Sequence, residues 1–360
     1  MKSLKIKSSF GNYNVIFKDS LIEVLQYITK TYNAHLIIDN NISVLYKKQI
    51  ELFEKKFKSF YSFEAIEKNK NLNHVMRYTQ LLLKMNIQKN QVLVVIGGGL
   101  VQDIGSFTAH ILKRGIRWVF IPTTLLSMSD CCIGGKSGIN VGQYKNQIGA
   151  FHPPAEILIT SELLHTLPKD QILNGIGEII KHSIIKGGKQ FTKIQSLLSK
   201  SIELESILES LIYYSLLIKK EIVEDDELDT GRRHLLNYGH SFGHALEGYS
   251  HNRIPHGIAV TIGMDIANYI SWKRKMISNI AYHDLTRFLR KYIPYSRVRI
   301  NDFKRYVDIL SRDKKVVNNV LHALLCRGVG RVETMKLNID ERLEKEIMDY
   351  TEDYRKNIIV

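Results

Sequence analysis

Short apolar segments alternate with helical or turn segments in the first half of the chain, and this alternation limits the fold more than any other feature. The apolar runs LKIKS, YNVIF, HLIID, QVLVVIG, RWVFIP and EILIT all precede Leu167. Such alternation favours an α/β domain with a largely parallel sheet. Beyond Leu167 strand patterns almost vanish, and KSIELESILESLIYYSLLIKKEIVEDDE has the apolar spacing of a helix. We therefore predict an α/β domain over residues 1–165 and a mostly α-helical domain over residues 166–360.

The composition is that of an ordinary globular protein, with 44% hydrophobic and 24% charged residues among 360. No apolar run approaches the roughly 20 residues of a membrane span, and the start MKSLKIKSSF lacks the apolar centre of a signal peptide. The cysteines are Cys131, Cys132 and Cys326, an odd number without a CxxC motif, which favours reduced thiols. We expect a cytoplasmic protein without a membrane partner.

The formal net charge of +15 raises the alternative of a noncatalytic basic protein that binds nucleic acid or another polyanion. The lysines are scattered, and the stretches KKQIELFEKKFKSF and NLNHVMRYTQLLLKMNIQKN have the pattern of basic helical faces. No motif of a nucleic-acid-binding module accompanies them. Because charge alone gives nonspecific affinity, we expect a solvated basic surface and no nucleic-acid partner.

A glycine run marks a candidate nucleotide site in the first domain. The predicted strand VLVVI leads directly into Gly97, Gly98 and Gly99, and a helical pattern opens around Asp103. Glycines at such a junction let a diphosphate approach the backbone N–H groups at the start of a helix. The run is not a GxGxxG fingerprint, because Gln102 occupies the last glycine position, and a simple turn is the alternative. Asp39 ends the strand HLIID and is followed by Asn41, and an acid at a strand end can accept hydrogen bonds from ribose hydroxyls.

The segment GRRHLLNYGHSFGHALEGYSHNRIPH, from Gly231 to His256, is dense in residues that bind metals or anions. His240 and His244 are four apart and share one face of a helix, and His256 follows a loop that can return toward them. Glu178, with Lys181 on the same helical face, is the candidate carboxylate ligand. Glycines beside the first two histidines lower helix propensity, which indicates close backbone approach there. A solvated histidine face and a simple Glu–Lys pair are the alternatives.

Seven motifs together resemble the 3-dehydroquinate synthases of the sugar phosphate cyclase superfamily, in order and in spacing. The resemblance extends from about Asp39 to Lys315 and adds little in the first 30 residues or beyond about Met335. The motifs are GGGLVQDIGSFTA, RGIRWVFIPTTLLSMSD, IGGKSGIN, YKNQIGAFHPP, GIGEIIKH, RHLLNYGHSFGHALE and RDKK.

The resemblance implies a Rossmann-like NAD-binding domain followed by a helical metal- and substrate-binding domain. A divalent metal, usually zinc with cobalt as the alternative, would be held by Glu178, His240 and His256. The residues expected to contact NAD are Asp39, Asn41, Glu67, Lys70, Gly98, Gly99, Asp103, Thr123, Thr124 and Lys145. The residues expected in catalysis are Asp130, Lys136, Lys181, His244 and Asn237, and those expected to bind substrate are Arg114, Asn146, Lys219, Arg233, Lys314 and Lys315.

The family's reaction accounts for these residue types. It cyclises a seven-carbon sugar phosphate by transient oxidation with NAD, phosphate elimination, reduction and intramolecular aldol closure, without net redox change. Phosphate would meet Lys136, Asn146, Asn237, His244 and one lysine of the pair Lys314–Lys315. Arg114 would reach in from a second subunit, which implies a homodimer.

Two cations at the family's carboxylate-binding positions, Arg233 and Lys219, favour 3-deoxy-D-arabino-heptulosonate 7-phosphate (DAHP) as the substrate. Departures from the family pattern are Gln102, the cysteines 131 and 132, and the approach VGQYKN. They leave open an amino-substituted DAHP or an inosose- or valiolone-type product. A metal-dependent polyol dehydrogenase, which would accumulate NADH, is a further alternative.

Overall fold

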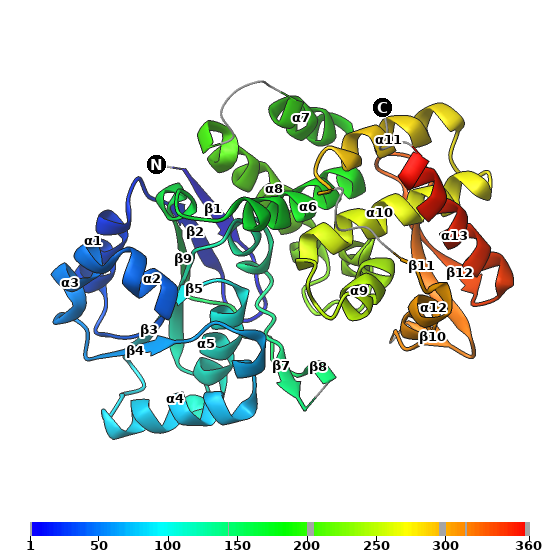
Figure 1. The fold of residues 1–360 in the computed structure, drawn as a ribbon. Helices are drawn as coiled ribbons and strands as arrows, with labels where there is room; N and C mark the ends of the chain where they lie inside the picture. Colours follow the sequence, from blue (N-terminus) through cyan, green and yellow to red (C-terminus); the bar gives the residue numbers. More distant parts are fainter. Residues whose placement is uncertain (1, 143, 200–204, 295–299, 314, 357–360) are drawn as a thin grey trace. The chain divides into compact units, whose positions relative to one another are not determined.

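The computed structural model describes residues 2–142, 144–199, 205–294, 300–313 and 315–356, whose contacts form two compact units (Figure 1). Unit 1 comprises Met1–Pro168 and Glu203–Asp229, and unit 2 comprises Lys169–Ile202 and Thr230–Val360. Helix α8 (Glu205–Asp225) therefore belongs to unit 1, although it follows the first segment of unit 2 in the sequence. The sequence analysis divided the chain after residue 165 and assigned NAD binding to the first domain and metal binding to the second. This assignment of roles stays a prediction.

Unit 1 is built on a seven-stranded sheet in the order β1-β2-β9-β6-β5-β3-β4. Only β1 and β2 pair antiparallel among these neighbours, which confirms the predicted largely parallel sheet. All residues of β3 and β5 are buried, as expected of central strands in a sheet covered on both faces. The strands are β1 (Ser3–Ile6), β2 (Tyr13–Phe17), β3 (Ala34–Asp39), β4 (Ser59–Phe63), β5 (Val92–Gly97), β6 (Arg117–Pro122) and β9 (Glu156–Ile159).

Helices of unit 1 begin at local sequence signals and bury one face. Ser20 caps α1 by accepting a hydrogen bond from the N–H of Glu23, and Asn71 caps α4 in the same way through His74. The predicted helical stretch after residue 47 ends early, because Ser59 begins β4. The elements are α1 (Leu21–Thr31), α2 (Asn40–Leu45), α3 (Lys47–Glu54), α4 (Leu72–Lys84), α5 (Gly99–Ile111), a hairpin of β7 (Ile139–Val141) and β8 (Tyr144–Ile148), and the short turns η1 (Glu67–Asn69), η2 (Leu112–Arg114), η3 (Ser127–Cys131) and η4 (Ser161–Leu164).

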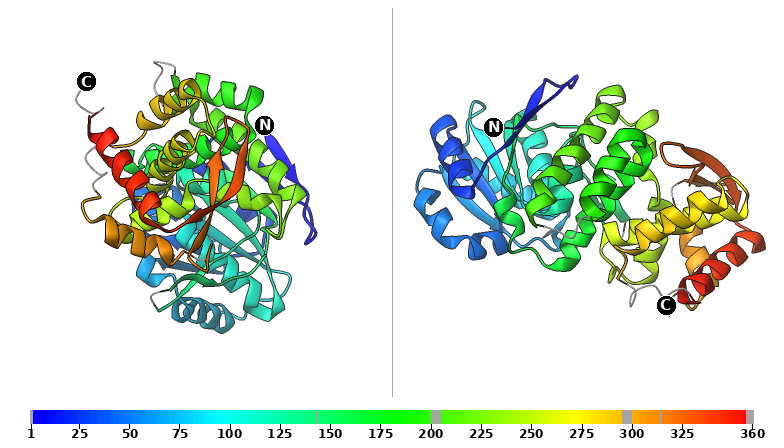
Figure 2. Two further views of the ribbon diagram at one scale, coloured as in Figure 1. Left: turned by 90° about the vertical axis from the view of Figure 1, so that its right-hand side faces the viewer. Right: turned by 90° about the horizontal axis from the view of Figure 1, so that it is seen from above.

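Helix α10 is the core of unit 2 and packs against α6, α9, α11, α13 and β11 (Figure 2). Its residues 257–271 are all buried, which is why the sequence HGIAVTIGMDIANYISWK is apolar on every side. A three-stranded antiparallel sheet that the sequence analysis missed follows α12. No described helix is long and apolar enough to cross a membrane. The elements are α6 (Lys169–Lys186), α7 (Gly188–Ser199), η5 (Arg232–Asn237), α9 (His240–Tyr249), α10 (His256–Lys273), α11 (Asn279–Arg290), α12 (Phe303–Ser311), β10 (Val316–Val317), β11 (Val320–Cys326), β12 (Val332–Asn338) and α13 (Glu341–Lys356).

Candidate active site

The carboxyl ends of β3 and β5 lie side by side in unit 1, at the point where the order of strands reverses. Ile38 pairs with Ile96, so Asp39 at the end of β3 is next to Gly97 at the end of β5. The Asp39 carboxylate accepts a hydrogen bond from the N–H of Asn41 at 2.9 Å and caps α2. Ligands of open α/β sheets bind at such a switch point. The structure thus brings together the two segments predicted to bind a nucleotide.

The glycine run lies between β5 and α5, which starts at Gly99 with Gly98 as its N-cap. A Cβ atom added at Gly98 would lie 3.0 Å from Cγ2 of Thr124, and one added at Gly99 would meet only Sγ of Cys131, at 3.9 Å. The N–H of Thr123 donates to the carbonyl of Gly97 at 3.1 Å. The first N–H groups of a helix favour an anion. The predicted threonines therefore adjoin an open helix N-terminus.

Three predicted ligand-binding side chains meet beside α5. Nζ of Lys70 lies 3.0 Å from Oδ2 of Asp103 and 2.6 Å from Oδ1 of Asn146. The other oxygen of Asp103 accepts the N–H of Gly138 at 2.9 Å, and Glu67 lies 3.9 Å from the Lys70 ammonium. Lys70 is buried, so this cluster balances its charge. Lys145, in β8, is exposed to solvent.

The predicted reaction-centre residues of unit 1 are tied to the last helix of that unit. Lys219 in α8 donates to the carbonyl of Asp130 at 2.7 Å and to its carboxylate at 2.5 Å. Lys136 forms an ion pair with Asp229, just beyond α8. Oδ1 of Asp229 is buried without a hydrogen-bond partner in the part of the chain that the structure describes. Lys219 and Asp229 thus supply counter-charges to residues 89 and 93 positions earlier.

Two departures from the family pattern touch each other. Nε2 of Gln102 donates to the carbonyl of Cys131 at 2.8 Å, and Gln102 is buried. Burial raises the pKa of the Cys131 thiol far above its ordinary value and that of Cys132 to about 12. Both thiols are therefore protonated near neutral pH, which argues against a reactive thiolate.

Three histidines and one glutamate converge in unit 2. The rings of His240 and His256 lie 5.1 Å apart between centroids, and His244 lies within 5.7 Å of both. Nε2 of His256 and Nε2 of His240 lie 3.6 and 3.9 Å from Oε1 of Glu178. The prediction that His256 returns to the helical pair is confirmed. Lys181 forms an ion pair with the other oxygen, Oε2, one turn along α6.

Glycines next to the converging residues let the three helices approach. A Cβ atom at Gly177, beside Glu178, would overlap the carbonyl of Gly257 on α10. A Cβ atom at Gly243 would lie 2.9 Å from the carbonyl oxygen of Ala259 on α10. Gly239 precedes His240 and adopts φ +79°, a left-handed conformation that favours glycine. The close backbone approach predicted beside the histidines is confirmed.

The charge and tautomer of His240 and the charge of His244 are compatible with a bound cation. Burial, with Lys181 and the neighbouring histidines, lowers the pKa of His240 well below its ordinary value, so its ring is neutral. Its Nδ1 lies 3.3 Å from the carbonyl oxygen of Tyr238, which leaves the lone pair on Nε2. Desolvation and the facing His256 lower the pKa of His244 to about 4, although part of that residue stays exposed.

The residues of this cluster fit a divalent metal, because one oxygen of the buried Glu178 carboxylate lacks a hydrogen-bond donor among the described residues. Oε1 of Glu178 is buried and accepts no hydrogen bond from any described residue. A buried carboxylate oxygen without a donor is costly, and a bound cation would satisfy it. Neutral imidazole nitrogens and a carboxylate form the mixed set that zinc accepts at catalytic sites. The alternative of a solvated histidine face is not supported, because Glu178 and His240 are largely buried.

The remaining predicted residues lie in both units. Arg233, in η5, is buried, and Asn237 at the end of η5 donates to the carbonyl of His234 at 3.0 Å. Nζ of Lys315 lies 3.3 Å from Oγ of Ser241. Lys314 lies outside the described residues. In unit 1, Arg114 is exposed with φ +60° and lines a cavity of about 640 Å³.

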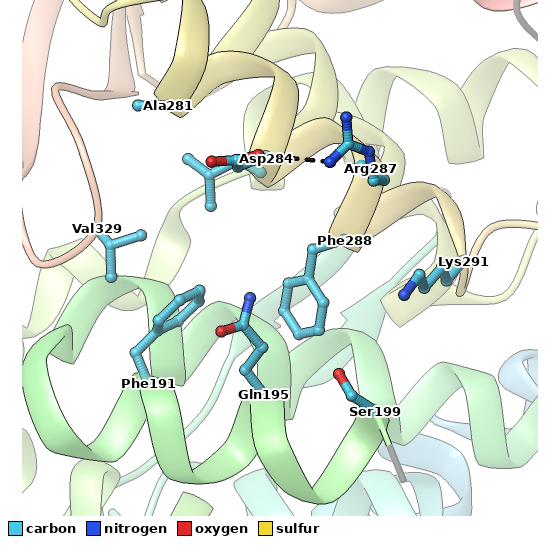
Figure 3. Close-up of a pocket in the computed structure, with 10 residues that line it drawn as sticks. Phe191, Gln195, Ser199, Ala281, Asp284, Arg287, Phe288, Lys291 and Val329 are labelled. Atoms are coloured by element: carbon cyan, nitrogen blue, oxygen red, sulfur yellow. Dashed lines mark ion pairs between the residues drawn. The ribbon is translucent and has the colours of Figure 1, made fainter. Parts of the chain in front are cut away.

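A separate cavity of about 420 Å³ lies between α7 and α11 in unit 2 (Figure 3). Phe191 on α7 and Phe288 on α11 face each other across it, with ring centroids 5.9 Å apart. Asp284 and Arg287 form an ion pair at its rim. None of the predicted site residues within the described ranges lines this cavity.

Family models of the 3-dehydroquinate synthase N-terminal and C-terminal regions match residues 60–174 and 175–316. This chain belongs to the 3-dehydroquinate synthase family. The curated 3-dehydroquinate synthase of Pelagibacter ubique (strain HTCC1062) is 34% identical over 96% of this chain and 98% of its own length. This family membership confirms the resemblance that the motifs predicted.

Two solved structures share the fold of this 3-dehydroquinate synthase family member. One is 2-deoxy-scyllo-inosose synthase complexed with carbaglucose-6-phosphate, NAD+ and Co2+, with a TM-score of 0.85 and 21% identity over 97% of this chain and 99% of that chain. The other is 2-epi-5-epi-valiolone synthase from Streptomyces hygroscopicus subsp. jinggangensis 5008 with NAD+ and Zn2+ bound, with a TM-score of 0.80 and 22% identity over 99% of each chain. Both confirm the predicted α/β and helical architecture.

The sequence analysis missed two carboxylates that contact predicted site residues. Asp229 pairs with Lys136 from 93 positions away, and it lies in the acidic run EDDELDTG, which has the composition of a solvated loop. Glu247 lies 3.3 Å from Nδ1 of His256. Its position seven residues after His240, on the same face of α9, was the available signal.

Proposed function

We propose that this chain converts DAHP into 3-dehydroquinate and phosphate, as an NAD- and metal-dependent cyclase that is a carbon–oxygen lyase. The observation that carries the proposal is the cluster of Glu178, His240 and His256, which holds a buried carboxylate oxygen without a hydrogen-bond donor among the described residues. Curated relatives named 3-dehydroquinate synthase match nearly the whole chain and support the same reaction.

The switch point of unit 1 is the proposed NAD site, and the cluster of unit 2 is the proposed metal site. Solved relatives of the same fold bind NAD+ with Co2+ or Zn2+, and we propose zinc here. When bound, NAD+ supplies a reversible hydride acceptor and the metal polarises a substrate oxygen. The backbone N–H groups at Gly98 and Gly99 would hold the diphosphate, and the Asp39 carboxylate would hold a ribose hydroxyl.

Two buried cations support a substrate that carries a carboxylate. Lys219 is 6% exposed and also contacts Asp130, and Arg233 is 4% exposed, so water would screen the attraction between either cation and a substrate carboxylate only weakly. Lys136, Asn146, Asn237, His244 and the lysines 314 and 315 are the proposed phosphate contacts. Arg114 would come from a second copy, so we propose a homodimer. The exposed side chain of Arg114 supports this assignment.

The chain's own residues mainly position the substrate and balance its charge. Lys181 holds one oxygen of Glu178, which leaves the other directed at the two histidine nitrogens. The neutral ring of His244 can accept a hydrogen bond from a substrate hydroxyl. During elimination, the phosphate can take the proton from the carbon between the transient ketone and the carbon that carries the phosphate; the carbon–carbon double bond forms as the C–O bond to phosphate breaks, so the protein need not supply a strong base.

The test measures phosphate release from DAHP by the zinc-loaded protein with NAD+, while the absorbance of NADH is followed. Phosphate release with 3-dehydroquinate by mass and without NADH accumulation supports the proposal. No phosphate release would contradict DAHP as the substrate and favour another sugar phosphate. Steady NADH accumulation would favour a polyol dehydrogenase.

Arg233→Ala tests the carboxylate contact, with the neighbouring exposed Arg232→Ala as its matched control. Loss of a buried charged hydrogen bond costs about 2–5 kcal/mol, so KM for DAHP should rise at least about thirtyfold while NAD affinity is unchanged. The Arg232 variant should keep nearly its full kcat/KM. Equal kinetics in both variants would contradict the assignment.

A further inference from the structure

His256 presents its two ring nitrogens to two different carboxylates. Nε2 lies 3.6 Å from Oε1 of Glu178, and Nδ1 lies 3.3 Å from Oε2 of Glu247. A neutral imidazole carries a proton on one nitrogen and a lone pair on the other. A carboxylate at Nδ1 accepts a hydrogen bond and therefore favours the proton there. The lone pair then lies on Nε2, which faces the centre of the cluster.

Glu247 is well placed to hold that ring. It follows His244 by three residues on α9, and its side chain is 14% exposed, so solvent competes weakly for its oxygens. Its backbone carbonyl accepts the N–H of Asn252 at 2.8 Å and the hydroxyl of Ser250 at 3.1 Å. These two bonds anchor the loop that returns the chain from α9 to His256. Glu247 therefore fixes both the path of the loop and the ring at its end.

The three histidines differ at Nδ1. His240 places Nδ1 3.3 Å from a backbone carbonyl oxygen, that of Tyr238. His256 has the side chain of Glu247 at that position. For His244 no hydrogen-bond partner exists within the described part of the chain. The two histidines whose Nε2 atoms face Glu178 are thus the two whose Nδ1 atoms have acceptors, and only the acceptor of His256 can be removed by substitution.

We propose that Glu247 is a positioning residue that holds His256 in its Nδ1–H tautomer and so sets the affinity of the cluster for a divalent metal. The proposal rests on the proposed function only in taking Glu178, His240 and His256 as ligands. Carboxylates that orient a metal-binding histidine typically contribute about 10–100-fold to metal affinity. A glutamate that only faced solvent on the surface of α9 would contribute nothing to the metal affinity.

The test is zinc binding by the full-length metal-free protein, in competition with a chromogenic chelator. Glu247→Ala should bind Zn²⁺ about 10–100-fold more weakly than the unchanged protein. Glu247→Gln keeps an acceptor oxygen without the charge and should lose less than about tenfold. His256→Ala, which removes a ligand, should lose the most. Glu333→Ala is the matched control, because Glu333 is an exposed partner of Arg327 in the same unit.

A second measurement is independent of metal binding. Nitrogen NMR of ¹⁵N-histidine-labelled metal-free protein, recorded at an alkaline pH where the His256 ring is neutral, should show His256 as the Nδ1–H tautomer, and Glu247→Ala should mix the tautomers. Zinc affinity within about twofold of the unchanged protein, with the tautomer preserved, would overturn the proposal. If circular dichroism shows that the Glu247→Ala variant is unfolded, the zinc affinity and the His256 tautomer of the Glu247→Gln variant test the proposal. Zinc binding that depends on Glu247 without turnover of DAHP would refute the proposed reaction and leave this inference intact.

Discussion

Unit 1 offers backbone N–H groups where β5 meets α5, whereas unit 2 offers side chains where α6, α9 and α10 meet. Around Gly99, the absence of a side chain leaves open space beside the helix start. Around Gly257, the backbone of another helix occupies the space that a side chain would need. Glycine therefore leaves open space at a helix start in unit 1 and admits a neighbouring helix in unit 2. Substitutions at the two places should have opposite consequences.

The largest expected effect is that of Lys181→Met, which removes the partner of a fully buried carboxylate. Breaking a buried ion pair leaves an uncompensated charge and costs about 3–5 kcal/mol. We expect this loss in urea unfolding of the metal-free protein, and saturating Zn²⁺ should restore part of it because the cation also balances Glu178. Lys186→Met, at the last residue of the same helix, is the control. Equal stability of the two variants would show that Glu178 is not charged in the metal-free cluster.

Gly257→Ala should be nearly as damaging, because its Cβ atom would overlap the backbone carbonyl of Asn174. Backbone atoms cannot move aside as a flexible side chain can, so we expect a loss of about 3 kcal/mol, at the upper end for overpacking. Zn²⁺ affinity should fall as well, since His256 is the adjacent residue. Urea unfolding and chelator competition measure the two effects. A stable variant with unchanged affinity would contradict close helix packing as the basis of the cluster.

Gly99→Ala should leave folding intact and weaken NAD binding. The added Cβ would meet only Cys131 Sγ at 3.9 Å, and alanine exceeds glycine in helix propensity by about 1 kcal/mol. Stability should therefore be unchanged or slightly higher. NAD affinity, measured by titration calorimetry, should fall because the methyl group occupies the space that the diphosphate needs. Unchanged NAD affinity would place the diphosphate elsewhere.

The smallest expected effect is a pH dependence from His35, a buried residue of β3 four positions before Asp39. Its Nδ1 lies 2.8 Å from Ser59 Oγ and its Nε2 lies 3.0 Å from Gln91 Oε1. Burial lowers the pKa of His35 in the folded state, so folding favours the neutral ring. Its contribution to stability is complete above the unfolded pKa of about 6.5 and is lost as the pH falls toward the folded pKa. The free energy of unfolding in urea should be measured between pH 7.5 and 5.5, a range that spans the unfolded pKa. It should decline less steeply with falling pH in His35→Gln than in the unchanged protein.

Local patterns in the sequence sufficed for the parallel sheet, the helical pair of histidines and the glycine contacts beside them. They failed at β11 and β12, because VLHALLC is apolar on nearly every position and the apolar residues Val332, Met335 and Leu337 of VETMKLN do not alternate strictly with polar ones, so neither has a clear period. They also failed at Asp229 and Glu247. A carboxylate that orients another side chain carries no motif of its own, and its partner is set by tertiary packing.

The position of α8 has a consequence for synthesis on the ribosome. Unit 1 cannot be complete until residues 203–229 have emerged, because Lys219 and Asp229 supply the charges that Asp130 and Lys136 contact. Glu178 has by then already left the exit tunnel, whereas His240 and His256 lie further along the chain than residue 229 and emerge later. Glu178, which belongs to unit 2, is therefore already outside the tunnel when the last segment of unit 1 emerges. Translation order thus favours completion of unit 1 before the cluster of Glu178, His240 and His256 can form.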